Sequence, residues 1–126
     1  MNPRAKSILL VDDNVGLRKS LRTLFEASGF VCTEAENGAQ GLEMAERLRP
    51  DLIVLDFSMP VMNGLEAASL FRKRVPEIPI IMFTMFADEA FTKVAVAAGV
   101  SEVISKERAA SHLVPRVASL LKFPTK

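Results

Sequence analysis

The residues of this 126-residue chain that are best suited to chemistry each follow a short strand-like run. In chain order they are Asp12 and Asp13, then Asp56, Thr84 and Lys106. If these runs are strands of a parallel sheet, their carboxyl ends meet along one edge of that sheet. We therefore expect three carboxylates, one hydroxyl and one ammonium group to converge on a single pocket.

Such a pocket suits the binding of a hard cation and of a phosphoryl group. Three acids in one cleft repel each other, and a cation relieves that repulsion. Mg²⁺ fits, because it takes oxygen ligands and often binds one or two carboxylates together with phosphate oxygens. Asp56 is then the candidate nucleophile, since attack by a carboxylate on phosphorus needs positioning and charge neutralisation. Thr84 can donate a hydrogen bond to a phosphoryl oxygen, and Lys106 can place its charge on another.

A simpler interpretation exists for each acid taken alone. An acid at a strand end can cap the next helix or lie in a solvated turn, and for Asp12 a cap explains the residue as well as a metal ligand does. The complete set argues against this interpretation, because four separate strand ends carry matching chemistry.

Five stretches are predicted as strands, and the third of them as the centre of the sheet. Its residues 52–55 are contiguous and apolar, which is typical of a strand buried on both faces. The predicted strands are residues 7–11, 31–35, 51–56, 79–84 and 102–105.

Five predicted helices alternate with these strands. They are residues 14–28, 37–49, 65–74, 88–99 and a last helix from 111 or 112 to about 121, which begins there because Pro115 fits only a first turn. The core faces of the first two helices are assigned to Leu17, Leu21, Leu24 and Phe25, and to Leu42, Ala45 and Leu48. Strict alternation predicts an α/β fold, a doubly wound parallel sheet with right-handed crossovers and helices on both faces.

Composition narrows the class of protein. The chain has 49% hydrophobic and 25% charged residues, which is typical of a soluble globular domain, and its net charge of +1 argues against a nucleic-acid surface. Its single cysteine, Cys32, cannot form an internal disulfide, and the chain has neither a signal segment nor an apolar run long enough to span a membrane. We expect a single domain, residues 1–126, in the cytoplasm, with no direct contact to nucleic acid or membrane.

The segment from Asp56 to Gly64, with the sequence DFSMPVMNG, resembles the phosphoacceptor loop of response-regulator receiver domains, the phosphorylation modules of two-component signalling. The resemblance covers essentially the whole chain and implies the flavodoxin-like strand order 2-1-3-4-5. It implies that Asp56 accepts phosphate from a histidine kinase or phosphotransfer protein. It also implies that Asp12, Asp13, Asp56 and the Ser58 carbonyl hold Mg²⁺, and that Thr84 and Lys106 are the switch hydroxyl and the phosphate-binding lysine.

Three positions depart from the receiver pattern. Val103 stands where many receivers have Tyr or Phe, so switching would have to rely on Thr84 and nearby backbone. Met85 replaces a small residue, and we expect it to slow the loss of phosphate from Asp56 unless it folds against the fourth helix. Glu107 replaces a proline that commonly follows the lysine through a cis bond. We expect a trans Lys106–Glu107 bond, because a non-proline cis bond costs about 3 kcal/mol.

Three functions compete on these residues. The favoured one is a phosphorylation-controlled switch without enzyme activity beyond its own phosphorylation and slow dephosphorylation. It would signal through the face formed by the fourth helix, fifth strand and fifth helix, to an unknown downstream protein or to an output domain outside this chain. The first alternative is a receiver-like adaptor that works without phosphate. The second is an aspartyl-phosphate phosphohydrolase, which Ser58 disfavours because haloacid dehalogenase-type enzymes carry an acid at that place.

Overall fold

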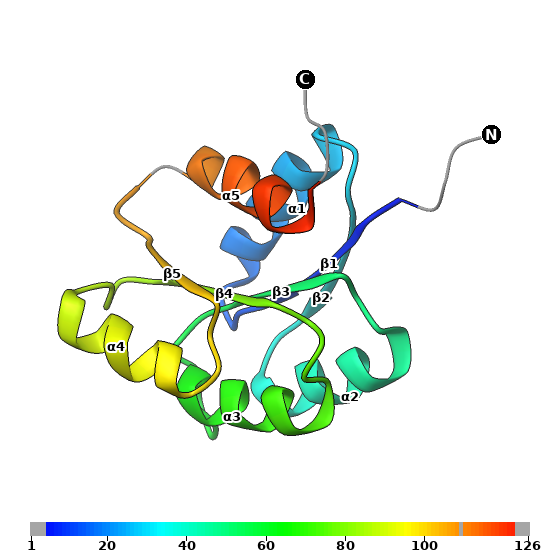
Figure 1. Cartoon of the computed structure of the whole chain (residues 1–126). Helices are drawn as coiled ribbons and strands as arrows, with labels where there is room; N and C mark the ends of the chain where they lie inside the picture. Colours follow the sequence, from blue (N-terminus) through cyan, green and yellow to red (C-terminus); the bar gives the residue numbers. More distant parts are fainter. Residues whose placement is uncertain (1–4, 109, 123–126) are drawn as a thin grey trace.

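The structure is a computed structural model that describes residues 5–108 and 110–122. A parallel sheet with strand order β2-β1-β3-β4-β5 runs through its middle (Figure 1). The strands are β1 (Ser7–Val11), β2 (Val31–Ala35), β3 (Leu52–Leu55), β4 (Ile80–Thr84) and β5 (Glu102–Ser105). The predicted fold class and strand order are confirmed.

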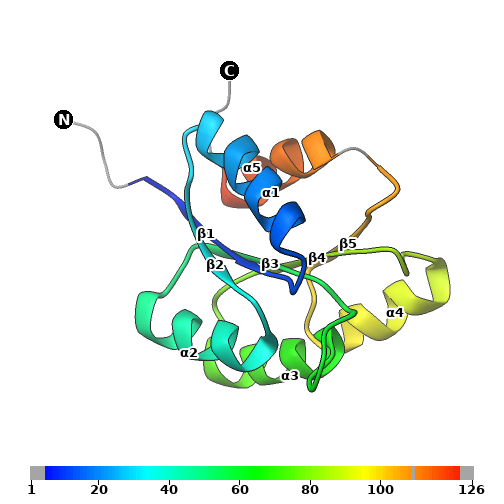
Figure 2. The ribbon, with the colours of Figure 1, turned by 180° about the vertical axis from the view of Figure 1, so that it is seen from behind.

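Helices cover both faces of the sheet. They are α1 (Val15–Ala27), α2 (Gly38–Leu48), α3 (Gly64–Arg74), α4 (Glu89–Ala97) and α5 (Leu113–Leu121), with a short 3₁₀ helix η1 (Ala110–His112) before α5. Figures 1 and 2 show α1 and α5 on one face and α2, α3 and α4 on the other. Pro115 lies in the first turn of α5, as predicted.

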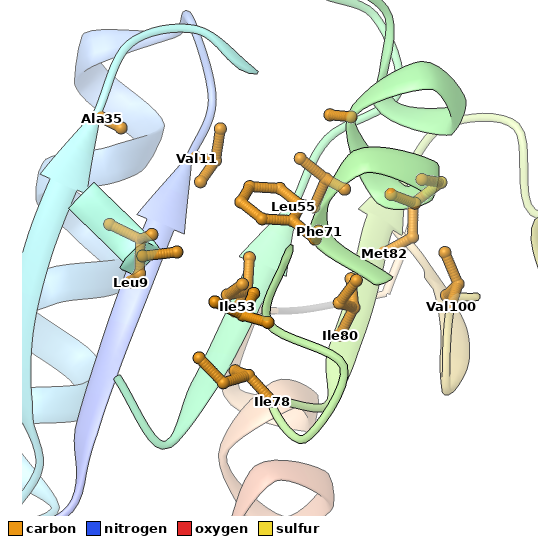
Figure 3. Packing of buried hydrophobic residues seen from close by; sticks show 14 of the residues in the cluster. Leu9, Val11, Ala35, Ile53, Leu55, Phe71, Ile78, Ile80, Met82 and Val100 are labelled. Atoms are coloured by element: carbon orange, nitrogen blue, oxygen red, sulfur yellow. The ribbon is translucent and has the colours of Figure 1, made fainter. Parts of the chain in front are cut away.

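Two hydrophobic layers separate the sheet from its helices, because successive strand residues point to opposite faces. Leu9 and Val11 of β1 belong to the layer under α2, α3 and α4, whereas Ile8 and Leu10 belong to the layer under α1 and α5. Figure 3 shows the first layer, in which the Phe71 ring of α3 lies among strand side chains. Burial of apolar surface on both faces holds the central strands rigidly, and their carboxyl ends are therefore well defined.

The predicted core face of α2 is wrong at one position. Leu48 is 46% exposed, whereas Gly41 is buried and a Cβ atom there would lie 2.9 Å from a Val11 methyl group. The helix thus packs through small residues, which let it approach β1 closely. Leu48 is the last residue of the helix.

Local sequence signals explain where the helices begin. Asn14, Asn37, Asn63 and Asp88 each precede a helix and accept a hydrogen bond from the backbone N–H three residues later. Asn63 also forms a capping box with Glu66. Within residues 5–108 and 110–122, no helix is long and apolar enough to cross a membrane.

Candidate functional site

The predicted site residues do converge at one edge of the sheet. Hydrogen bonding continues past the ends of the strands: the Asp56 N–H donates to the Val11 carbonyl at 3.0 Å, and the Lys106 N–H donates to the Thr84 carbonyl at 2.8 Å. Asp12 follows Val11 directly, and β3 pairs with β4, so the four strand ends lie side by side. The carboxyl edge of a parallel sheet is where α/β folds bind ligands.

Lys106 links two of the acids. Its Nζ lies 3.1 Å from Asp12 Oδ2 and 3.3 Å from Asp56 Oδ1. Asp12 and Asp56 are each only 5% exposed. The lysine thus stands beside the carboxylate of the candidate nucleophile, where its charge can stabilise added negative charge.

Asp12, Asp13 and Asp56 form an acidic cluster with a shortage of positive charge. One carboxylate oxygen from each of the three lies within 4.8 Å of the others. Burial, and secondly the charge of Asp12, raise the pKa of Asp56 above its ordinary value, although Lys106 opposes this shift. These are hard oxygen ligands in need of a cation, so their chemistry fits Mg²⁺.

Thr84 is fully buried at the end of β4, and its Oγ1 accepts a hydrogen bond from the Phe86 N–H at 3.3 Å. Phe86 packs edge-on against Phe57, with ring centroids 5.3 Å apart, and Phe57 packs in the same way against Phe91 of α4 at 5.2 Å. The residue after the candidate nucleophile is therefore joined through aromatic contacts to the loop after Thr84 and to α4. The sequence prediction did not include this cluster.

Gly64 allows the loop after Asp56 to close tightly. Its N–H donates to the Phe57 carbonyl at 2.8 Å, and a Cβ atom at this position would lie 2.7 Å from Phe57 Cα and in collision with the Asp56 carbonyl. Only glycine fits so close to backbone atoms. The glycine of the Asn63–Gly64 pair is thus required by close packing next to the candidate nucleophile.

The remaining predicted positions lie around the rim of the site. Ser58 is exposed two residues after Asp56, and its carbonyl stays a predicted ligand. Met85 is 58% exposed and does not belong to either core layer. Val103 is partly buried and packs against the core beneath α4. The described residues contain no cis peptide bond, so the expected trans Lys106–Glu107 bond is confirmed.

Two further residues next to the site were missed in the sequence. Arg18 of α1 donates from Nη1 to the Asp12 carbonyl at 2.6 Å, and its Nε donates to Glu34 of β2 at 3.0 Å. Sixteen residues separate Arg18 from Glu34, and neither belongs to a recognisable motif. No signal in the sequence indicates that they meet beside Asp12.

The sequence of this chain is similar to those of known proteins. It is 39% identical over 102 residues to the chemotaxis protein CheY of Halobacterium salinarum, covering 81% of this chain and 85% of that protein. It is 36% identical over 116 residues to the response regulator MprA of Mycobacterium leprae, covering 91% of this chain but 50% of that protein. The chain thus spans most of the chemotaxis protein and about half of the longer regulator.

Solved structures agree with the sequence comparison. A CheY-like response regulator receiver domain protein from Methanospirillum hungatei superimposes with a TM-score of 0.89 at 26% identity, over 94% of this chain and 95% of that one. The family model described as "Response regulator receiver domain" matches residues 8–118, a span that holds all the convergent acids, Thr84 and Lys106. Fold, site and sequence therefore agree that this chain belongs to the response regulator receiver domains of two-component signalling.

Proposed function

We propose that residues 1–126 act as one receiver domain that is switched by phosphorylation of Asp56. The observation that carries this proposal is the position of Lys106 Nζ, 3.3 Å from Asp56 Oδ1 and 3.1 Å from Asp12 Oδ2. A lysine held between a buried nucleophile and a metal-ligand candidate can balance the charge of an incoming phosphoryl group. No acid that merely caps a helix needs such a partner.

The reaction is a phosphoryl transfer between two protein side chains. Receiver domains work with histidine kinases and output domains, and the donor proposed here is a phosphohistidine on a histidine kinase or phosphotransfer protein. An Asp56 carboxylate oxygen attacks phosphorus, the phosphorus–nitrogen bond breaks, and the electron pair leaves with the imidazole. The product is an acyl phosphate on Asp56, which water later hydrolyses.

Mg²⁺ is the proposed cofactor, held by Asp12, Asp13, Asp56 and the Ser58 carbonyl. Receiver domains bind Mg²⁺ at an acidic pocket, and the three carboxylates here form one. When bound, the ion neutralises the acids and the transferred phosphoryl oxygens. The chain's own share of the chemistry is to position the Asp56 carboxylate and to keep Lys106 beside it.

Thr84 is the proposed switch. Its hydroxyl now accepts from the Phe86 N–H at 3.3 Å, and donating instead to a phosphoryl oxygen would rotate the side chain away from that contact. Phe86 would then be free to move against Phe57 and Phe91. This route needs no aromatic ring at position 103, where the chain has Val103.

The proposed output surface is the face formed by α4, β5 and α5. A groove of about 600 Å³ lies along β5 and α5, lined in part by Val103, Arg108, His112 and Arg116. Phe86, before α4, and Val94, on α4, are exposed apolar side chains that a partner could also contact. Ala87, in the loop after Thr84, is one of the residues that line the groove, so movement of this loop would alter the shape of the groove.

Receiver domains of response regulators are generally not enzymes that turn over a metabolite, and no such activity is proposed for this chain. The test is the intact mass of the protein after incubation with Mg²⁺ and either a small acyl phosphate or a histidine kinase. We expect a gain of about 80 Da that is absent in Asp56→Asn. No gain with either donor would refute the switch and favour an adaptor that works without phosphate.

A further inference from the structure

Residues outside the site hold the backbone of the Asp12–Asp13 turn by hydrogen bonds. The Asp12 N–H donates to the Ala35 carbonyl at 3.1 Å, and its Oδ1 accepts from the Asn14 N–H at 2.9 Å. The remaining backbone group, the Asp12 carbonyl, accepts from Arg18 Nη1 at 2.6 Å. This last contact comes from a side chain that takes no part in the chemistry described above.

The Asp12 carbonyl matters because it belongs to the peptide plane that joins Asp12 to Asp13. The six atoms of a peptide unit move together, so holding this oxygen also fixes the Asp13 N–H and the start of the Asp13 residue. Asp13 is the exposed member of the acidic cluster. Its carboxylate can therefore depend on that plane for its direction toward Asp12 and Asp56.

Arg18 is itself fixed by a second contact. Its Nε donates to Glu34 Oε1 at 3.0 Å, and the two side chains are only 11% and 9% exposed. Glu34 also accepts from Lys19 at 3.1 Å and from Arg22 at 3.0 Å. A planar guanidinium that bonds a carboxylate with one nitrogen and a carbonyl with another has little freedom to turn.

We propose that Arg18, anchored by Glu34, is a positioning residue that orients the Asp12–Asp13 turn for cation binding. The inference rests on the proposed magnesium site and adds a residue to it. Arg18 touches neither the cation nor the phosphoryl group in this role. Its effect passes through the Asp12 carbonyl, as an outer contact orients a metal ligand.

An effect of the Arg18 charge and an effect of Arg18 on the position of the turn would change Mg²⁺ affinity in opposite directions. As a cation close to the acids, it repels Mg²⁺, so removing its charge alone would tighten binding slightly. If it positions the turn, removing it loosens Asp13 and weakens binding. The sign of the change therefore separates the two effects.

The experiment is a titration of the ¹⁵N-labelled chain with MgCl₂, followed by the amide signals of Asp13 and Lys106. We expect Arg18→Ala to raise the Mg²⁺ dissociation constant about tenfold. Arg18→Lys should weaken binding nearly as much, because an ammonium cannot reproduce two directed contacts. Both variants should also shift the Asp13 amide signal before Mg²⁺ is added, while the other amide signals keep their native dispersion.

Lys19→Ala is the matched control. Like Arg18→Ala, this variant removes one positive charge and one of the cationic partners of Glu34. Lys19, however, does not donate to the Asp12 carbonyl, which accepts from Arg18. We expect no weakening of Mg²⁺ binding in this variant. The double variant Arg18→Ala/Glu34→Gln should bind no more weakly than Arg18→Ala alone, because Glu34 acts through Arg18.

Unchanged or tighter Mg²⁺ binding in a folded Arg18→Lys or Arg18→Ala protein would overturn the inference. Equal weakening in Lys19→Ala would also overturn it, because a general charge effect would then be responsible. If the wild-type chain shows no Mg²⁺-dependent shifts at all, the proposed magnesium site fails together with the role of Arg18. A positive titration with no gain of phosphoryl mass would leave Arg18 supported and refute only the proposed switch.

Discussion

Replacing Asp56 by Asn should stabilise this protein while abolishing its proposed activity. Burial and the charge of Asp12 raise the pKa of Asp56, so the folded chain holds a proton on this group more readily than the unfolded chain does. An ionised Asp56 therefore lowers the free energy of unfolding at neutral pH. That cost disappears as pH falls from the raised pKa to below the ordinary one.

Burial of the carboxylate contributes to the expected gain, and the part that can be worked from distances follows from the charges around it. At an effective dielectric constant of about 20, repulsion from an acid whose oxygen lies within 4.8 Å is worth at least about 3.5 kcal/mol, and the attraction to Lys106 at 3.3 Å about 5 kcal/mol. Two acids repel Asp56 and one lysine attracts it, so the balance of charges favours neutralisation by at least about 2 kcal/mol. Because Asp13 is exposed and screened by water, we expect about 1–2 kcal/mol in practice, or a rise of about 4–8 °C in Tm.

The assay is thermal unfolding followed by circular dichroism, in EDTA and again with MgCl₂. Asp56→Asn should unfold at higher temperature than the wild type in EDTA, and it should gain less from Mg²⁺ because one ligand is lost. Asp51→Asn is the control, since Asp51 accepts the Ser7 N–H at 2.8 Å away from the acidic cluster and its replacement should not stabilise the fold. The reasoning is refuted if Asp56→Asn in EDTA is no more stable than the wild type.

Three more changes test separate parts of the structure. Gly64→Ala should lower the free energy of unfolding by about 1–3 kcal/mol in urea titrations, because its Cβ would lie 2.7 Å from Phe57 Cα; a neutral result would mean that the loop can shift freely. Burial acts to raise the pKa of Glu34, but its three cationic partners lower this pKa from 4.5 to about 2, so the free energy of unfolding should fall as pH falls from about 4.5 toward 2. In an acid titration, Glu34→Gln should lack this pH-dependent loss of stability. An identical pH profile for variant and wild type would contradict the expectation. Met85→Ala should shorten the lifetime of the phosphoryl group on Asp56, measured as the decay of phosphorylated mass, and an equal or longer lifetime would show that Met85 does not shield it.

Local signals in the sequence were sufficient for the elements. The predicted strands 7–11, 31–35 and 102–105 match the structure, and 51–56 differs from β3 by one residue at each end. Asparagine and aspartate caps begin four of the helices. The fifth begins at Leu113, one residue after the predicted start at 111 or 112, and has Pro115 in its first turn. These signals act within a few residues along the chain, so they can be recognised without knowing the fold.

The convergence of the site was also predictable, because it depends only on strand order and direction. Once the strands are parallel, Asp12, Asp56, Thr84 and Lys106 must lie at one edge. Their roles in phosphoryl transfer and Mg²⁺ binding remain predictions that the experiments above test. The exposure of Leu48 was not predictable from the spacing of apolar residues. The face of α2 that packs on the sheet includes Gly41, which has no apolar side chain to mark it in the sequence.

The sequence by itself determined the alternating elements, the order of the reactive residues and the breaks between helices. Tertiary structure alone decided that Lys106 bridges Asp12 and Asp56, and that Arg18 reaches both Glu34 and the Asp12 carbonyl. The physical reason is that these contacts join residues on different elements. Their distances depend on the register between strands and on how closely each helix packs on the sheet, and both are set only when the two core layers form.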